Sequence, residues 1–212
     1  YGINSGTTGG STVLGAVTYD VSKAGTYGTL YVKSADGSYA YVPVASAVNA
    51  LTANSTDSFT ISASDGAGPP GIGTNTFTVN MSAVNDAPLL TTPTAIALSD
   101  TASTDSFTHQ TGTLNATDAE GTALSYALTG ATTGGATSFS GVTYDLSLAG
   151  KYGTLYLVST GADKGKYIYV PDATKINALT ADAVDSFGVG AGDGTLSLNP
   201  AVTPWPVIHL AA

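Results

Sequence analysis

The side chains best suited to chemistry in this sequence are carboxylates and amides that could bind a divalent cation. A calcium ion takes roughly six to eight oxygen ligands, so its ligands must converge from separate loops. The acidic residues are almost all Asp, which favours turns and oxygen-rich cation sites. The sequence predicts a calcium site where two domains meet, with the ligands Asn85, Asp86, Asp118, Glu120 and Asp193.

Convergence of these ligands depends on the strands that flank Asp118 and Glu120. These residues lie in a loop between two expected strands, at residues 112–117 and 123–129. If the chain runs away from the interdomain linker along the first strand and back along the second, the loop returns to the linker. Like charges held close together repel, so such a cluster favours a bound cation.

Asp193 could join this cluster from the last hairpin. This requires that an expected helical crossover at residues 173–179 changes the alternation of strand directions, so that the hairpin ends near the linker. The alternative is that these acidic residues only form turns, which Asp-Gly and Asn-Asp pairs do readily. Asp20 and Asp145 occupy matching turns, and each is expected to bond backbone amides two or three residues further along the chain.

Catalytic chemistry has little support. The two histidines, His109 and His209, have no counterparts in the repeat described below. No Gly-rich phosphate loop ends in Lys followed by Ser or Thr. No motif suggests the paired carboxylates of a glycosidase, and the lack of Cys excludes a thiol nucleophile. We expect a protein that is not an enzyme.

The charge balance limits the possible partners. Six basic residues, all of them Lys, stand against fifteen acidic residues, which gives a formal net charge of −9. Surfaces that follow nucleic-acid phosphates need clustered cations, so we expect no nucleic-acid partner. No apolar stretch approaches the roughly 18 residues of a membrane-spanning helix, so we expect no membrane insertion.

An internal repeat organises the chain. The stretch at Val17–Tyr31 recurs at Val142–Tyr156, and Tyr39–Pro43 recurs at Tyr167–Pro171. Two domains are expected, a first at residues 1–86 and a second at residues 87–212. The first has no counterpart of residues 88–125, so we expect it to lack its opening strands. The second is expected to end in an atypical segment at residues 195–212, which departs from the segment that closes the first copy.

The pattern within each copy is typical of β-strands. Apolar and polar residues alternate at residues 59–65 and 77–82, as in half-buried strands. Residues 30–32 and 39–41 fit a hairpin around the loop at 34–37, in which Gly37 supplies a positive φ. Short helices are expected at residues 45–51 and 173–179. The sequence thus predicts an all-β protein of two tandem β-sandwiches.

The twelve Tyr residues fall into six matched pairs. Exposed tyrosines would favour a carbohydrate-binding module, because aromatic faces stack on sugars. The expected hairpin register buries Tyr39, Tyr41 and their counterparts, and packing is the safer interpretation. The tyrosines left as candidates for exposure are Tyr27, Tyr31, Tyr152 and Tyr156.

Several motifs, in consistent order over residues 1–194, resemble the bacterial VCBS-type repeat. They are Tyr27-Gly-Thr-Leu30, Asp36-Gly-Ser-Tyr39, Asp57-Ser-Phe59, Ser64-Asp-Gly66, Val84-Asn-Asp-Ala-Pro88 and the stretch at Thr111–Gly121. The resemblance implies Ig-like or cadherin-like domains in a long, repetitive, secreted bacterial surface adhesin. It also implies a role in adhesion, biofilm or cell-surface structure, neighbouring repeats as partners, and calcium that stiffens the linkers.

The expected lack of opening strands suggests one further possibility. A first domain with exposed strand edges invites pairing with another chain, so the protein could be a filament subunit assembled by inter-chain β-strand addition. The C-terminal segment is apolar enough to supply such a strand, through Leu196, Leu198, Val202, Val207, Ile208 and Leu210.

Overall fold

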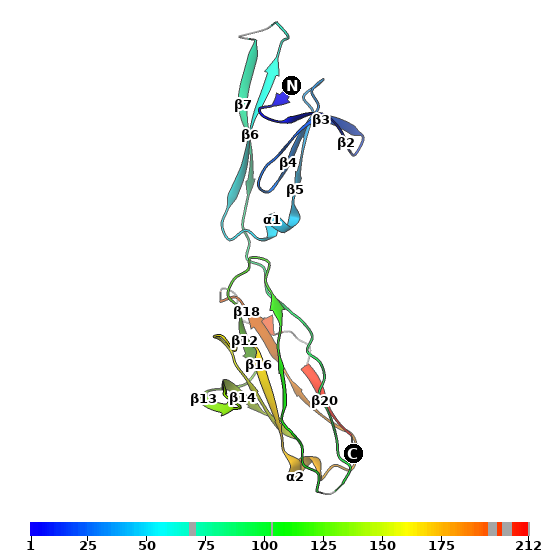
Figure 1. The fold of residues 1–212 in the computed structure, drawn as a ribbon, viewed down its shortest axis with the longest axis vertical. Coiled ribbons are helices and arrows are strands. Elements are labelled where there is room, and N and C mark those ends of the chain that lie inside the picture. Colours follow the sequence, from blue (N-terminus) through cyan, green and yellow to red (C-terminus); the bar gives the residue numbers. More distant parts are fainter. Residues whose placement is uncertain (68–70, 103, 195–198, 201–204, 212) are drawn as a thin grey trace. The chain divides into compact units, whose positions relative to one another are not determined.

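The computed structural model describes residues 1–67, 71–102, 104–194, 199–200 and 205–211, with side chains described up to residue 194 (Figure 1). The chain divides into two compact units, Tyr1–Asp86 and Ala87–Ala212. We call them unit 1 and unit 2 and describe each by itself. Strands make up nearly all of the regular secondary structure, with only two short helices, and the fold class is all-β and sandwich-like, as the sequence predicts.

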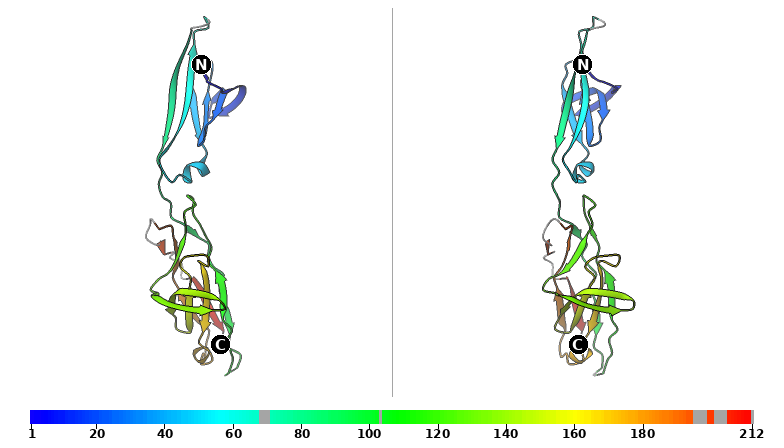
Figure 2. Two further views of the ribbon diagram at one scale, coloured as in Figure 1. Left: turned by 60° about the vertical axis from the view of Figure 1, so that its left-hand side comes forward. Right: turned by 90° about the vertical axis from the view of Figure 1, so that its left-hand side faces the viewer.

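Unit 1 contains two antiparallel sheets. The first has the order β1 (Gly2–Ile3), β6 (Ser55–Ser64), β7 (Ile72–Met81). The second has the order β2 (Thr7–Leu14), β3 (Val17–Ala24), β4 (Gly28–Val32), β5 (Tyr39–Pro43). The helix α1 (Ala45–Asn49) connects β5 to β6 and so carries the chain from one sheet to the other. Figure 2 shows the long β6–β7 hairpin on one side of the unit and the β2–β5 sheet on the other.

Unit 2 repeats this plan with additional strands. Its larger sheet has the order β10 (Gln110–Thr113), β16 (Lys166–Pro171), β15 (Gly153–Leu157), β14 (Val142–Ala149), β13 (Thr132–Phe139). The opposite side contains β12 (Ser125–Leu128), β18 (Val189–Gly192) and β19 (Asn199–Pro200), and also β17 (Ala183–Phe187), β20 (Trp205–Ala211) and β9 (Ala97–Ser99). The short strands β8 (Leu89–Leu90) and β11 (Ala116–Thr117) pair with each other, and α2 (Ala173–Ile176) joins β16 to β17.

The two units share one strand register. Leu30 pairs with Tyr41 in unit 1, and their counterparts Leu155 and Tyr169 pair in unit 2. The predicted hairpin is confirmed: Val32 lies opposite Tyr39, and Gly37 has a φ of 77° in the connecting loop. The repetition in the sequence therefore extends to the pairing of individual residues.

The units differ at the outer edges of their sheets. In unit 2, β10 pairs with β16, and β9 pairs in parallel with β20. In unit 1, β5 and β7 are the outermost strands of their sheets among the described residues. The strands that cover both edges in unit 2 belong to residues 88–125, for which unit 1 has no counterpart.

The C-terminal segment lies within unit 2. β20 pairs with β17, and β19 pairs with β18, so together they take the place that β7 has beside β6 in unit 1. In the described structure Val207, Ile208 and Leu210 belong to β20, which pairs with β17 of the same unit. They are therefore not part of an unpaired strand that could add to a neighbouring chain. Leu196, Leu198 and Val202 lie outside the described residues.

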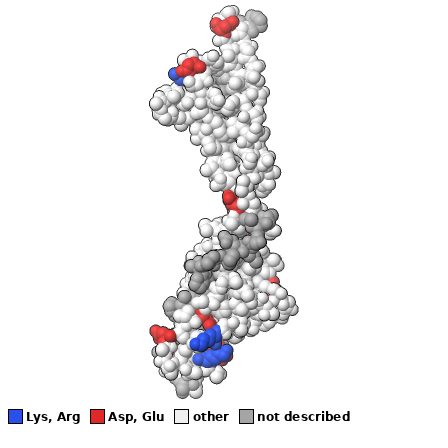
Figure 3. All heavy atoms as spheres, turned by 180° about the vertical axis from the view of Figure 1, so that it is seen from behind, with Lys and Arg blue, Asp and Glu red and all other residues white. Residues whose placement is uncertain are grey.

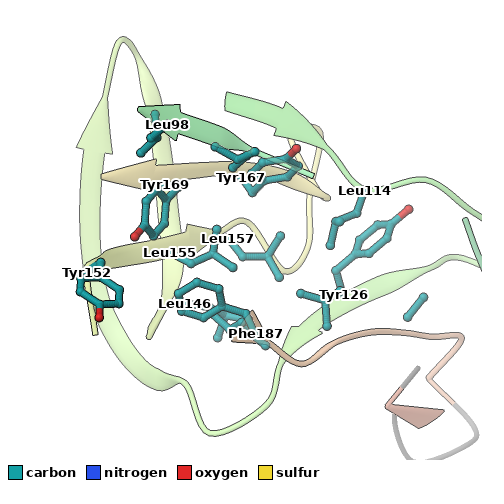
Figure 4. Packing of buried hydrophobic residues seen from close by; sticks show 14 of the residues in the cluster. Leu98, Leu114, Tyr126, Leu146, Tyr152, Leu155, Leu157, Tyr167, Tyr169 and Phe187 are labelled. Atoms are coloured by element: carbon teal, nitrogen blue, oxygen red, sulfur yellow. The ribbon is translucent and has the colours of Figure 1, made fainter. Parts of the chain in front are cut away.

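The core of unit 2 is the more extensive of the two. Leu155, Leu157 and Tyr169 point inward from neighbouring strands and meet Leu114 and Phe187 in one apolar cluster (Figure 4). Unit 1 buries a smaller cluster, which consists of Ile3, Val21, Leu30, Val32 and Phe59.

Two expectations about tyrosines are wrong. Tyr39 is 61% exposed, whereas its counterpart Tyr167 is only 7% exposed. The reason is that β10 covers Tyr167, while no described strand of unit 1 pairs with β5 on the side away from β4. Tyr152, a candidate for exposure, is buried, and Tyr27, Tyr31 and Tyr156 are partly buried.

Charged side chains are sparse on the face shown in Figure 3, which agrees with the low content of charged residues. None of the helices in the described part of the chain is long and apolar enough to cross a membrane.

Candidate functional site

The predicted calcium ligands are divided between the two units. Asn85 and Asp86 are exposed residues at the end of unit 1. The other three predicted ligands, Asp118, Glu120 and Asp193, belong to unit 2. A calcium site that draws on both groups stays a prediction.

Strand pairing places the loop that carries Asp118 and Glu120 near the beginning of unit 2. The expected strand at residues 112–117 is divided into β10 and β11, and β11 pairs with β8 so that Thr117 lies opposite Leu89. Asp118 directly follows Thr117. The partner of Thr117, Leu89, is only three residues after Asp86 in the sequence. The loop therefore lies at the end of unit 2 where its first strand, β8, begins.

The carboxylate of Asp118 is only partly satisfied by protein donors. Its Oδ2 atom accepts hydrogen bonds from the amide of Thr122 at 2.9 Å and from the Thr122 hydroxyl at 2.8 Å. Its Oδ1 atom is buried and has no hydrogen-bond partner in the structure. A buried carboxylate oxygen without a donor is unfavourable, and a bound cation would satisfy it.

Asp193 lies at the end of β18, next to the paired residues Ser125 and Gly192. Its side chain is buried, with 8% of the residue exposed. β12 begins at Ser125, directly after the loop that carries Asp118, so Asp193 and that loop are near one end of the sheet. Among the residues that the structure describes, no three His, Cys, Asp or Glu side chains form a group that could hold a metal ion.

The two most deeply buried acidic residues in the described part of the chain are not among the predicted site residues. Asp57 on β6 and Asp185 on β17 are each 4% exposed, and they occupy matching positions of the repeat. Asp57 accepts hydrogen bonds from the amides of Thr26 at 2.8 Å and Tyr27 at 3.0 Å, and from the Tyr41 hydroxyl at 2.7 Å.

Asp185 repeats this arrangement in unit 2. It accepts hydrogen bonds from the amides of Lys151 at 2.7 Å and Tyr152 at 2.8 Å, and from the Tyr169 hydroxyl at 2.9 Å. Each carboxylate lies on one sheet, while its tyrosine and its turn amides belong to the opposite sheet. The arrangement is a polar tether between the two sheets of each unit.

Glycines in the repeated Ala-Gly-x-Tyr-Gly sequence make room for this tether. A Cβ atom on Gly150 would lie 2.5 Å from Asp185 Oδ2, and one on Gly153 would lie 2.4 Å from Cζ of Tyr169. Gly25 and Gly28 stand in the same relation to Asp57 and Tyr41. Both approaches are too close for a side chain, so the turn can reach the carboxylate only where these positions are glycine.

The surroundings of the unit 1 tether shift both pKa values. Burial is the largest influence on Asp57 and acts to raise its pKa. The hydrogen bonds from Tyr41, Thr26 and Tyr27 together outweigh burial and leave the pKa of Asp57 below its ordinary value. Burial and the hydrogen bond to Asp57 raise the pKa of Tyr41 to about 12.

The same causes act on Tyr169 in unit 2. Burial and the hydrogen bond to Asp185 raise the pKa of Tyr169 above its ordinary value. In both units the tether consists of a carboxylate held by two backbone amides and a tyrosine hydroxyl. Because the carboxylate oxygens bond amides and a phenol of the opposite sheet, they hold the two sheets of each unit together.

The expected role of Asp20 and Asp145 is wrong. Asp20 accepts a 2.7 Å hydrogen bond from the amide of Ser34, fourteen residues away, and also bonds the Ser34 hydroxyl. Asp145 does the same with Ser159, with 2.8 Å from its Oδ1 atom to the amide. The neighbouring strands bring these residues together, so each Asp fixes the chain beyond the next strand and not its own turn.

His109, the histidine whose side chain the structure describes, packs against an aromatic ring and not against either group of carboxylates. The His109 ring packs edge-on against Phe139, with 5.4 Å between the ring centroids. The side chain of His209 is outside the described part of the structure. No protein-family model matches the chain, and no curated protein matches its sequence.

Proposed function

We propose that this chain is a non-catalytic structural or adhesive repeat module of a secreted bacterial surface protein. It extends or builds a structure at the cell surface, with neighbouring repeats as its partners. The observation that carries the proposal is the recurrence of the sheet-to-sheet tether in both units. The repeated Asp, Tyr and Gly residues are used to hold sheets together, which is what a repeated mechanical element requires.

The path of the chain through unit 1 supports a load-bearing role. Of the strands in unit 1, β1 comes first in the sequence and β7 comes last, and both pair antiparallel to β6. β1 and β7 therefore run parallel to each other on either side of β6. A pull between the two ends of the unit acts along the strand axes, so several ladder hydrogen bonds must break together.

Single-molecule pulling of the full chain tests this role. Handles at Tyr1 and Asp86 load the strands of unit 1 along their axes. Handles at Ala53 and Asp86 instead peel β6 from β7, beginning at the pair formed by Ser55 and Met81. We expect the first geometry to need a several-fold higher unfolding force, because peeling breaks the hydrogen bonds one after another. Equal forces in the two geometries would contradict a load-bearing module.

We further propose that calcium binds near the loop of Asp118 and Glu120. The buried Oδ1 atom of Asp118 without a donor supports this proposal, and so does the position of the loop close to the start of unit 2. Asp193, Asn85 and Asp86 are the remaining proposed ligands. A bound calcium ion would supply charge neutralisation and stiffness at this end of the unit.

The extracellular location rests on the resemblance to VCBS-type repeats. The motifs that carry it include Tyr27-Gly-Thr-Leu30 and Asp57-Ser-Phe59, and these are the residues that form the tether and its turn. Repetitive surface proteins use such domains in adhesion and biofilm. Detection of the full-length protein at the bacterial surface by labelling of intact cells would test this location.

Carbohydrate binding is the second candidate function. Tyr1 and Tyr39 are both about three-fifths exposed and line one apolar groove of unit 1. Aromatic faces of this kind can stack on sugar rings. Binding on a glycan array that is lost in Tyr39→Ala would favour this candidate over a purely structural module, and a chain that binds no glycan would exclude it.

A further inference from the structure

The outer edge of β5 in unit 1 corresponds to an edge that is covered in unit 2. β5 pairs with β4 on one side in the same register in which β16 pairs with β15. On its other side β16 pairs with β10, with Gly112 opposite Tyr167 and Thr111 opposite Ile168. Among the described residues, β5 has no partner on that side. An open edge of this kind presents backbone donors and acceptors to an incoming strand.

An apolar groove lies beside this edge. It has a volume of about 340 Å³ and is lined by side chains of both sheets, among them Leu30, Val32, Tyr39, Ile61 and Phe77. The Tyr39 ring reaches across to Phe77, with 5.1 Å between the centroids, yet remains 61% exposed. The groove is therefore a part of the sandwich interior that unit 1 does not fill with its own side chains.

Unit 2 shows what fills the corresponding space. Leu114, directly after β10, is 2% exposed and belongs to the same core cluster as Leu155 and Leu157. Its amide donates a 2.8 Å hydrogen bond to the carbonyl oxygen of Gly165, whose counterpart Gly37 lines the groove of unit 1. One strand thus completes the sheet and also places a leucine in the core.

Besides the leucine that enters the core, β10 needs a glycine at position 112. A Cβ atom at Gly112 would lie 2.3 Å from the hydroxyl oxygen of Tyr167, so the phenol packs directly on the glycine backbone. The counterpart of Tyr167 in unit 1 is the exposed Tyr39. A strand that covers Tyr39 in the same way needs glycine opposite it, and leucine two positions further on.

We propose that unit 1 accepts an extended strand from another polypeptide, with the Gln-Thr-Gly-Thr-Leu chemistry of residues 110–114. The incoming strand runs antiparallel to β5, with its Gln opposite Tyr41, its Gly opposite Tyr39 and its Leu in the groove. This proposal rests on the structural role proposed above and adds a partner to it, because strand addition between chains links modules into a larger assembly.

A fluorescent peptide with the sequence of residues 107–117 tests the proposal on the full chain. We expect saturable binding to the protein. A peptide with Leu114→Asp should bind at least about tenfold more weakly, because it would bring a charge into the apolar groove. A peptide with Gly112→Val should be weakened to a similar extent, because the added side chain would meet Tyr39.

Disulfide trapping then tests the register, since the chain has no Cys of its own. The predicted neighbour of Thr111 is Ala40, so a Thr111→Cys peptide should crosslink to the Ala40→Cys protein. A Thr113→Cys peptide belongs opposite Ser38 and should crosslink to Ser38→Cys in preference to Ala40→Cys. Ile168→Cys is the matched control in unit 2, where the chain's own β10 occupies the edge, and it should not react.

Two results would overturn the proposal. One is a parent peptide that does not bind, or that binds no better than its Leu114→Asp variant. The other is crosslinking of Ala40→Cys to a second copy of itself with no effect of added peptide, which would mean that two β5 edges pair with each other. Neither result bears on the pulling experiment, whose outcome depends on strands within unit 1, so the two proposals fail separately.

Discussion

The hydroxyl of Tyr169 on β16 donates a 2.9 Å hydrogen bond to Oδ2 of Asp185 on β17, and these strands belong to opposite sheets of unit 2. Tyr41 and Asp57 form the same bond at 2.7 Å in unit 1. In both units the carboxylate also holds the amides of a turn between two strands of the sheet that carries the tyrosine. A single Asp therefore connects three segments that are distant in the sequence.

Replacing the carboxylate should destabilise each unit. Asp185→Asn leaves a neutral amide beside two backbone N–H groups and a phenol, and we expect a loss of about 3 kcal/mol in the free energy of unfolding. Denaturant unfolding of the full chain would measure it. The control is Asp163→Asn, whose ion pair with Lys166 is on the surface and should contribute less than about 1 kcal/mol. Equal effects of the two substitutions would contradict a structural tether.

The glycine beside the tyrosine ring should also be required. Gly153→Ala brings a methyl group against both the buried ring of Tyr169 and the carbonyl oxygen of Val170. We expect a destabilisation of about 2 kcal/mol from this overpacking, measured by thermal unfolding. Gly135→Ala is the matched control, because no atom lies within 4 Å of its added Cβ. A Gly153→Ala protein as stable as the Gly135→Ala protein would show that the ring can move aside.

The stability of unit 1 should depend on pH at both extremes. The pKa of Asp57 is lowered in the folded protein, so its contribution is present above the ordinary value of 3.8 and is lost as the pH falls through the folded value. The pKa of Tyr41 is raised to about 12, so its contribution is present below pH 10 and is lost as the pH rises toward 12.

Hydrogen exchange of the β6–β7 amides would follow unit 1 within the full chain. The Asp57→Asn protein should lose the acid dependence that arises from this group, and the Tyr41→Phe protein should lose the corresponding alkaline dependence. If neither substitution changes the dependence of amide exchange on pH, the tether does not contribute to the stability of unit 1.

Calcium should stabilise the chain if the proposed ligands bind it. At a free calcium concentration roughly a hundredfold above the dissociation constant, binding adds about 2.7 kcal/mol to stability. Melting temperatures in calcium and in chelator would detect this difference. Asp118→Asn should reduce it, while Asp163→Asn should leave it intact. Melting temperatures that are the same in calcium and in chelator would exclude a calcium site.

The parts of the fold that could be predicted are those that local sequence determines. Alternating residues and Gly37 define the β4–β5 hairpin, because strand periodicity and a positive φ depend only on neighbouring residues. Asp57 could not be matched with Tyr41 in this way, because they lie in different sheets and no local pattern specifies that contact. The recurrence of both residues in the two copies was the available signal.

Two errors have the same physical origin. Asp commonly bonds nearby amides, which predicts a role for Asp20 in its own turn, but the pairing of β3 with β4 brings Ser34 within reach. The hairpin register places Tyr39 on the same face as apolar residues and so predicts that it is buried. Its exposure depends on whether another strand covers β5, which the residues of the hairpin do not determine.

The central claim is that the repeated carboxylates are structural anchors, and amide hydrogen exchange at Lys151 and Tyr152 tests it most directly. Both amides donate to Asp185, so we expect both to exchange slowly in the native protein and at least about a hundredfold faster in Asp185→Asn. Asp163→Asn should leave their exchange unchanged. Fast exchange of both amides in the native protein, or exchange that Asp185→Asn does not accelerate, would contradict the claim.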